Sequence, residues 1–353
     1  MQIQYLEAVI LYLLKKINGE RTIYSLFHLF QGKRSSQTIQ DAHLYQLLPF
    51  FYSYPSITRR KLEKAVNSLI ESGLAEEIAE TKVVLTSSGI QELDLKLAEC
   101  PLPIYLNGWK YHQVTEPFWE RLTLLIQVSS NLVHRERSFI PVRNKKETLY
   151  WIKHYIRQQG EDRYQLAERL YQELTATLEN QESRPELIVL RLTGFKKIGL
   201  TAVQAAELAG LEPAHYHFEF LNSLHAMIDK IMNDPANFPL LNGLINQPEQ
   251  KVPLTQSTEK TFKMLQKDYS LEEIAAVRNL KESTVEDHIV EIVLSVKDFV
   301  IDDYVLPEKQ HRILEAARKI GAKRLKQIRE QVVDVSYFEI RLVLAKYGDA
   351  EWN

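Results

Sequence analysis

The stretch from Tyr269 to Ile292, YSLEEIAAVRNLKESTVEDHIVEI, predicts two short helices joined by a tight turn. Ser270 and Glu273 have the spacing of a capping box, in which a hydroxyl and a carboxylate each satisfy a free backbone N–H at the helix start. Asn279 is a residue type that ends helices in the left-handed conformation, and Leu280 follows it in the turn. This order of signals indicates a helix-turn-helix.

Each of the two expected helices has one apolar face. A second capping box, Ser283 with Glu286, is expected to open the second helix. The small side chain of Ala275 lets the two helices cross closely, as the motif requires. The residues expected on the two apolar faces are Leu271, Ile274, Ala275 and Val277 on the first helix, and Val285, Ile289, Ile292 and Val293 on the second.

Length and composition predict a helix-rich protein of two or three domains. The chain has 353 residues, 45% of them hydrophobic, with only 12 glycines and 13 prolines. Its net charge of −2 means that affinity for nucleic acid must come from a local patch. The single cysteine, Cys100, excludes an intrachain disulfide and fits a reducing cytoplasm. The apolar start, MQIQYLEAVILYLLKKI, lacks a basic leading segment and predicts a buried helix rather than a membrane anchor.

The order of patterns predicts a mainly α protein in three parts. An N-terminal winged helix with a small β-hairpin is expected over residues 1–98, because several helical patterns precede two short β-like runs. A helical middle domain is expected over 115–234 and a C-terminal helix-turn-helix bundle over 253–348. Proline-containing linkers are expected between them, at 99–114 and 235–252.

Residues 195–222 carry a weaker copy of the helix-turn-helix pattern, displaced by 69 positions. Thr201 and Gln204 correspond to the capping box of Ser270 and Glu273. Gly210 stands at the position of Asn279, and Pro213 at the start of a following helix, where its missing N–H is tolerated. A second helix-turn-helix is therefore expected in the middle domain.

The sequence lacks the motifs of enzymes and cofactor sites. It contains no glycine-rich phosphate loop of the GxxxxGK[ST] or GxGxxG type, no HExxH and no GxSxG. The histidines are scattered, and His215 and His217 fall on different faces of a helix, so no metal site is expected. We therefore expect a non-enzymatic protein without a cofactor, which leaves a binding function.

Acidic residues dominate the second helix of the C-terminal motif. A helix that reads duplex DNA usually presents Arg or Lys to guanine edges and phosphates. Here four carboxylates are expected on the surface, opposed only by Lys281 and His288, so insertion into the major groove is disfavoured. The helix-turn-helix is then either a packing module or a surface for a basic protein partner, and the carboxylates of that surface are Glu282, Glu286, Asp287 and Glu291.

Basic residues cluster in three other places. Between Glu308 and Glu330 eight basic residues stand against three acidic ones, a net charge of +5. The second cluster opens the helix expected over 56–72, where a winged helix enters the DNA groove, and a loop over 134–147 is the weakest of the three. Each cluster is either a phosphate-binding surface or a solvated helical face. The DNA-binding candidates are Arg59, Arg60, Lys61, Lys64, Lys309, Arg312, Arg318, Lys319, Lys323, Arg324, Lys326 and Arg329.

The span Thr258–Lys346, with SLEEIAAVRNLKESTVEDHI and SYFEIRLVLA, resembles the helix-turn-helix module at the C-terminus of some RecQ-family helicases. The whole chain, with GKRSSQT near Gly32 and its winged start, resembles the YpbB-like proteins of Gram-positive bacteria. That resemblance implies a partner of the RecQ-like helicase class and an accessory role in DNA unwinding, recombination or repair. The TVxxH string is also similar to response-regulator DNA-binding domains, but Glu286 stands where those tend to have a basic residue.

The sequence thus predicts a cytoplasmic adaptor, with association with the nucleoid as a further option, that binds DNA without strong sequence preference, a RecQ-like helicase, or both. Two alternatives remain open. One is a transcription regulator that binds duplex operator DNA through its winged helix, and the other is a scaffold that binds proteins only.

Overall fold

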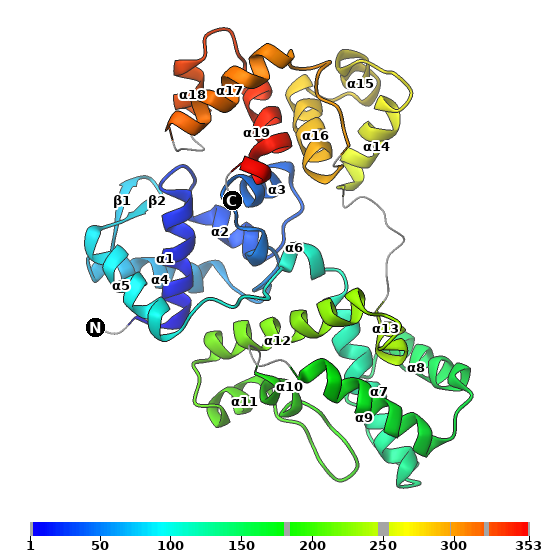
Figure 1. Ribbon diagram of the computed structural model, residues 1–353. Coiled ribbons are helices and arrows are strands. Elements are labelled where there is room, and N and C mark those ends of the chain that lie inside the picture. The colour runs from blue at the N-terminus through cyan, green and yellow to red at the C-terminus, as the bar shows by residue number, and fades with distance from the viewer. Residues whose placement is uncertain (1–2, 180–183, 246–253, 297, 321–324, 352–353) are drawn as a thin grey trace. The chain divides into compact units, whose positions relative to one another are not determined.

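The computed structural model describes residues 3–179, 184–245, 254–296, 298–320 and 325–351. These residues form nineteen α-helices, one 3-10 helix and one two-stranded hairpin, so the expected mainly α fold is confirmed (Figure 1). The chain divides into two compact units. Residues 1–10 and 91–248 form the first unit, and residues 11–90 and 249–353 form the second.

The winged-helix part contains helices that precede a hairpin. Helices α2 to α4 and the hairpin lie in the second unit, whereas α1 and α5 are divided between the two units. Helix α4 is the last helix before that hairpin, the position of the DNA-facing helix in a winged helix. Strands β1 and β2 pair antiparallel, with Ala75 opposite Leu85. The bounds are α1 Tyr5–Ile17, α2 Ile23–Phe30, α3 Ser36–Leu44, the 3-10 helix η1 Leu48–Phe50, α4 Arg59–Glu71, β1 Ala75–Ala79, β2 Lys82–Leu85 and α5 Ser87–Glu99.

The C-terminal part of the second unit is a helical bundle built around α16. The capping box of Ser270 and Glu273 is confirmed, and Asn279 has the expected left-handed backbone, with φ 51°. The apolar face expected on α16 is also confirmed, because Val285, Ile289, Ile292 and Val293 are all buried. The bounds are α14 Gln256–Leu265, α15 Leu271–Arg278, α16 Glu282–Ser295, α17 Pro307–Ile320, α18 Leu325–Gln331 and α19 Tyr337–Glu351.

Three local expectations in and near this bundle are wrong. The second capping box does not form, because α16 begins at Glu282, directly after Lys281, whose side chain makes no capping hydrogen bond. Val277 is 67% exposed, since the apolar contacts of the short helix α15 are made by Leu271, Ile274 and Ala275. Exposure of all four carboxylates on α16 is also wrong, because Glu291 is completely buried.

Helix α3 joins the winged-helix part of the second unit to the bundle. It packs against α16 and α19, and Leu44 lies against the apolar core of the bundle. Two residues far apart in sequence meet here, because the Ser36 hydroxyl donates to a Glu291 carboxylate oxygen at 3.3 Å. The chain was expected to separate these two parts into different domains, whereas the structure places them in one compact unit.

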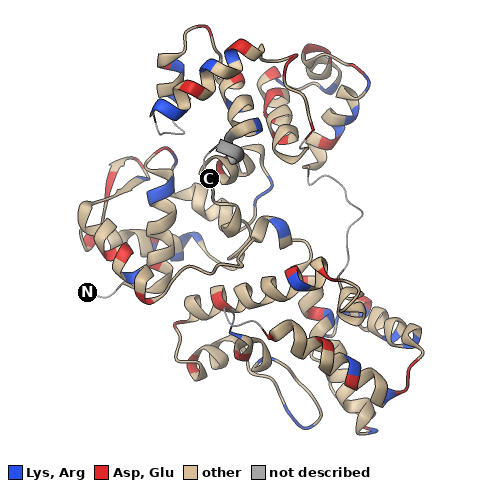
Figure 2. Ribbon diagram, in the orientation of Figure 1, with Lys and Arg blue, Asp and Glu red and all other residues tan. Residues whose placement is uncertain are grey.

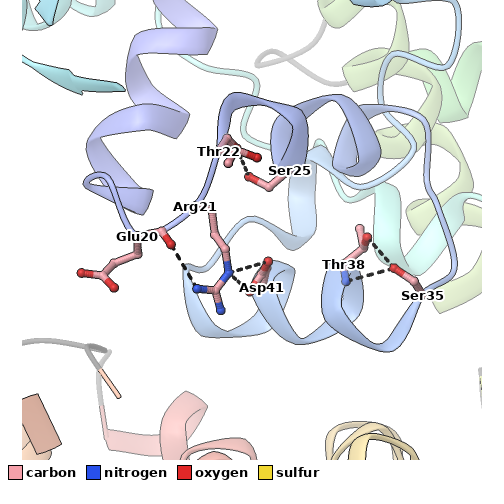
Figure 3. A network of polar contacts seen from close by, with 7 residues as sticks. All are labelled: Glu20, Arg21, Thr22, Ser25, Ser35, Thr38 and Asp41. Atoms are coloured by element: carbon pink, nitrogen blue, oxygen red, sulfur yellow. Dashed lines mark hydrogen bonds and ion pairs between the residues drawn. The ribbon is translucent and has the colours of Figure 1, made fainter. Parts of the chain in front are cut away.

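An ion pair anchors α3 on its other side (Figure 3). Arg21, in the turn after α1, donates from Nε to both carboxylate oxygens of Asp41, at 2.9 and 3.0 Å. Burial raises the pKa of Asp41 to about 6, although the guanidinium of Arg21 opposes this shift. Ser35 caps the start of the helix by accepting from the Thr38 N–H. Helix α3 is thus fixed at its N-terminus and at its centre.

The first unit is a helical assembly around one large apolar core. The local signals of the weaker helix-turn-helix copy occur in it: Thr201 and Gln204 form a capping box, Gly210 has φ 65°, and Pro213 opens the next helix. Part of the linker expected over 235–252 is structured, because Leu240 and Leu241 are buried. The bounds are α6 Gly108–Tyr111, α7 Thr115–Val133, α8 Lys146–Gln159, α9 Arg163–Leu178, α10 Pro185–Val189, α11 Ala202–Leu208, α12 Pro213–Asn233 and α13 Pro239–Asn242.

Candidate nucleic-acid interface

Helix α4 buries one face and exposes a row of cations on the other. Its start is fixed by Thr58, whose hydroxyl accepts from the backbone N–H of Lys61 at 3.2 Å, so the helix begins at Arg59, three residues later than the helix expected over 56–72. Leu62, Ala65, Val66 and Leu69 face the core, at the spacing of one side of a helix. The remaining face carries the four cations expected from the sequence, all of them exposed: Arg59, Arg60, Lys61 and Lys64.

Aromatic side chains hold two of these cations in place without neutralising them. The Arg59 guanidinium lies over the rings of Tyr24 and Phe27, at 5.1 and 5.5 Å from their centroids. The Lys61 ammonium donates to the Tyr54 hydroxyl at 2.6 Å. Among the described residues, no carboxylate forms an ion pair with any of the four cations of α4. The nearby carboxylate of Glu63 accepts instead from the Tyr24 hydroxyl, at 2.9 Å.

The arrangement of charge at the start of α4 is unfavourable for the isolated helix. Free N–H groups give a helix N-terminus partial positive charge, so a cation in the first turn costs roughly 0.3–1 kcal/mol. Helix α4 has no acidic residue in its first turn and begins instead with Arg59, Arg60 and Lys61. An anion placed there would meet both the helix dipole and three side-chain charges. The helix start is therefore electrostatically suited to a phosphate group.

Lys33 extends this basic surface, although sequence reasoning did not select it. It follows Gly32, which has φ 64° and whose added Cβ would lie 2.5 Å from Tyr52, so the turn after α2 requires glycine. Burial, together with the positive charges of Lys33 and Arg59, lowers the pKa of His28. Lys33 itself is exposed. The GKR string after α2 was the available signal, and the fold brings the turn before it toward the start of α4, because the Gln31 side chain donates to the carbonyl oxygen of Ile57 at 3.3 Å.

The hairpin beside α4 carries the opposite charge. Glu76, Glu77 and Glu80 are exposed on it, against the single cation Lys82. Carboxylates at these positions would repel phosphates, whereas winged helices that use the hairpin on DNA need neutral or basic side chains there. The hairpin is therefore unsuited to phosphate contact, which leaves α4 and the turn that contains Lys33 as the candidate surface. We call these five cations, Lys33, Arg59, Arg60, Lys61 and Lys64, the α4 surface.

The second basic cluster, on α17 and α18, is partly neutralised. The ammonium of Lys309 pairs with Glu339 at 2.9 Å, and that of Lys319 pairs with Glu315 at 2.8 Å. Figure 2 shows acidic and basic segments alternating along α17. The Arg329 guanidinium stacks on the ring of Tyr337, 4.6 Å from its centroid. Ion pairs thus neutralise Lys309 and Lys319, whereas the stacked Arg329 keeps its charge.

The remaining cations of this cluster are only partly available for phosphate. Arg312 donates to the carbonyl oxygen of Val333 at 3.1 Å, and the side chains of Arg318 and Lys326 are exposed. Lys323 and Arg324 lie outside the described residues.

Helix α16, the second helix of the C-terminal motif, is enclosed by its neighbours. It packs against α14, α15, α19 and α3. Glu291 accepts from the Thr255 N–H at 2.5 Å and from the Thr258 hydroxyl at 2.7 Å, so its carboxylate links α16 to the start of α14. Asp287 pairs with Arg341 of α19 at 2.6 Å. Of the four carboxylates expected to face a partner, only Glu282 is fully exposed, and Glu286 is half-buried.

His288 was expected on the surface and is instead buried against α14. Its Nδ1 lies 2.9 Å from the hydroxyl of Thr261. Burial, and to a smaller extent the positive charge of Arg278, lowers the pKa of His288 to about 4. The imidazole is therefore neutral at pH 7 and belongs to the core of the bundle.

The described helices are each too short or too polar to cross a membrane. Within the same residues, His, Cys, Asp and Glu side chains form no cluster of three or more that could hold a metal ion.

The fold and the basic helix before its hairpin define a helix-turn-helix protein with a winged-helix part. A family model described as a helix-turn-helix domain matches residues 257–344. Protein YpbB of Bacillus subtilis (strain 168) is 36% identical to the chain over 349 residues, which cover 98% of each sequence. The chain belongs to the YpbB family. No solved structure matches it. The domain and the family together indicate a DNA-binding or regulatory role.

Proposed function

We propose that this protein binds the phosphate backbone of DNA through the α4 surface, with little preference for sequence. The observation that carries the proposal is the row of four exposed cations at the start of α4, which no described carboxylate neutralises. Contacts to phosphates fix the position of a protein on DNA and carry no sequence information by themselves. The acidic hairpin beside α4 supports a short contact, confined to the helix start.

The finer part of the proposal is that the protein is an adaptor for a RecQ-like DNA helicase. It rests on the resemblance of residues 258–346 to a module found at the C-terminus of such helicases. The packing of α16 supports it, because a helix in contact with four others is not free to enter a DNA groove. In this arrangement the winged helix contacts DNA and the C-terminal bundle contacts protein.

Fluorescence anisotropy with three labelled DNAs tests the DNA-binding part. A forked duplex, a blunt duplex of the same sequence and a single strand are each titrated with the full chain over a series of salt concentrations. We expect the logarithm of the affinity to fall linearly with the logarithm of the salt concentration, as release of counterions requires. We also expect the affinity to be highest for the fork. Absence of binding to all three DNAs at low salt would overturn the proposal in favour of a protein-binding scaffold.

The same assay separates the adaptor from a transcription regulator. A regulator discriminates strongly among duplex sequences, since each mismatched base pair typically costs about 1–3 kcal/mol. We expect affinities for unrelated duplexes to agree within about threefold. Selection from a random duplex library that returned one preferred sequence would contradict the adaptor reading.

A helicase assay tests the partner. The rate at which a RecQ-like helicase from the same organism unwinds the forked duplex is measured with and without the protein. We expect a change in the rate at protein concentrations that saturate binding. An unchanged rate, together with no binding between the two purified proteins, would rule out the helicase as the partner. The proposed DNA contact would then be judged by the anisotropy data alone.

A further inference from the structure

The C-terminal bundle contains an open groove of about 860 Å³ that the DNA proposal does not use. Its walls come from the end of α14, the turn into α15, the connection between α16 and α17, and the start of α19. Segments that are distant in sequence therefore form one concave surface. All of them belong to the second unit.

The floor of the groove is apolar and largely aromatic. Phe262, Phe299, Tyr304 and Phe338 follow one another across it, with successive ring centroids 6.5, 6.2 and 6.1 Å apart. Phe299, Tyr304 and Phe338 rest on the core of the bundle, which fixes their positions. Val300, at the edge of the groove, is 62% exposed. Aromatic rings held in a concave surface are typical anchoring points for side chains of a binding partner.

The rim of the groove is acidic. Asp268, Glu272, Asp298 and Asp303 line it, and all four are exposed. Within the described part of the chain, none of these carboxylates forms an ion pair. The two acidic segments, residues 268–273 and 298–304, contain six carboxylates and no Lys or Arg. A partner that meets this rim must bring positive charge.

Cations also lie close to the groove. The Lys346 ammonium donates to the carbonyl oxygen of Phe299 at 2.9 Å, a neutral acceptor that leaves its positive charge in place. Lys267 and Lys297 flank the two acidic segments in sequence, and Lys297 lies outside the described residues. One rim carboxylate also influences the aromatic floor. Burial of Tyr304, together with the negative charge of Asp303, raises the pKa of the Tyr304 hydroxyl.

We propose that this groove binds a basic segment of a partner protein, with Lys or Arg side chains at the acidic rim and one or two apolar side chains on the aromatic floor. DNA is excluded as the occupant by repulsion between the rim carboxylates and phosphates. The inference does not depend on the α4 surface. It assigns protein recognition to a different set of acidic residues from those expected on α16.

Two synthetic peptides of equal length and equal positive charge test the groove. One carries a Leu and a Phe between its Lys and Arg residues, and the other has Ser in both places. We expect the apolar-anchored peptide to bind the full chain at least tenfold more tightly, measured by anisotropy at physiological salt. Hydrogen exchange should show protection of residues 262–272 and 296–304 on binding. Equal affinities, or protection elsewhere, would overturn the proposal.

A charge-neutral variant supplies the second test. Asp268→Asn together with Asp303→Asn removes one carboxylate from each acidic segment, and Asn tolerates the left-handed backbone of Asp268, with φ 62°. The matched control, Glu76→Gln with Glu77→Gln, removes two exposed carboxylates from the hairpin. We expect at least a tenfold loss of affinity for the anchored peptide in the first variant and less than a twofold change in the control. Equal losses in both would show attraction by net charge alone and contradict a specific groove.

Discussion

Glu291 shows how one buried residue decides the role of a whole helix. Its carboxylate is fully buried and accepts hydrogen bonds from α14 and from α3, the latter through Ser36. A buried carboxylate is tolerated only when its hydrogen-bonding capacity is filled. The residue expected to meet a protein partner therefore holds three helices of the same chain together.

We predict that Glu291→Ala lowers the free energy of unfolding by about 3 kcal/mol, because it leaves the Thr255 N–H and the Thr258 hydroxyl without their acceptor. The measurement is the midpoint of urea unfolding. Glu282→Ala, at the exposed start of the same helix, is the control and should cost less than about 1 kcal/mol. Similar costs for the two variants would contradict the internal role of Glu291.

His288 makes the stability of the bundle depend on pH. Its pKa falls from the ordinary 6.5 to about 4 in the folded state. As pH drops from about 6.5 toward 4, the unfolded chain takes up a proton at this position before the folded chain does, so the unfolding free energy falls. A shift of this size corresponds to roughly 3 kcal/mol.

Urea unfolding measured at several pH values between 4.5 and 7 checks this effect. We expect His288→Gln, which cannot be protonated, to flatten the decline in unfolding free energy toward acid pH. His311→Gln, at an exposed position, should leave the decline as it is. A decline of the same steepness in His288→Gln would mean that other groups cause it.

At the scale of elements, some helix starts follow from local sequence signals and others do not. The capping box at the start of α15 could be predicted from Ser270 and Glu273, because both partners lie within one turn. The one expected at Ser283 fails although the residue types are right, since α16 starts two residues earlier than that box requires. No side-chain cap marks the start of α16, and the helix is held by packing against four others.

The two serines give a matched test of this difference. We predict that Ser270→Ala lowers the unfolding free energy by about 1 kcal/mol, the typical loss of a helix cap. Ser283→Ala, in an exposed first turn without a capping bond, should change it by less than about 0.5 kcal/mol. Thermal or urea unfolding of the two variants is the measurement, and a larger loss for Ser283→Ala would contradict the structure at the start of α16.

For the whole molecule, the sequence could predict what depends on neighbours in the chain and could not predict what depends on distant segments. The cations of α4 are adjacent in sequence, so their common exposed face follows from helical periodicity. Lys33 joins them only through the turn after α2. The contact of Ser36 with Glu291 spans most of the chain, and no local pattern indicates it. The aromatic groove likewise assembles from segments around Phe262, Phe299 and Phe338.

The central claim is that the α4 surface contacts phosphate, and the salt dependence of DNA binding tests it most directly. Arg60→Gln with Lys64→Gln removes two exposed cations spaced four residues apart on α4, and Lys153→Gln with Arg157→Gln removes two exposed cations at the same spacing on α8. Each phosphate contact contributes roughly 0.9 to the slope of log affinity against log salt on duplex DNA. We expect the α4 variant to lose about 2 from this slope and the α8 variant to keep it. An unchanged slope in the α4 variant, or an equal loss in both, would contradict the account.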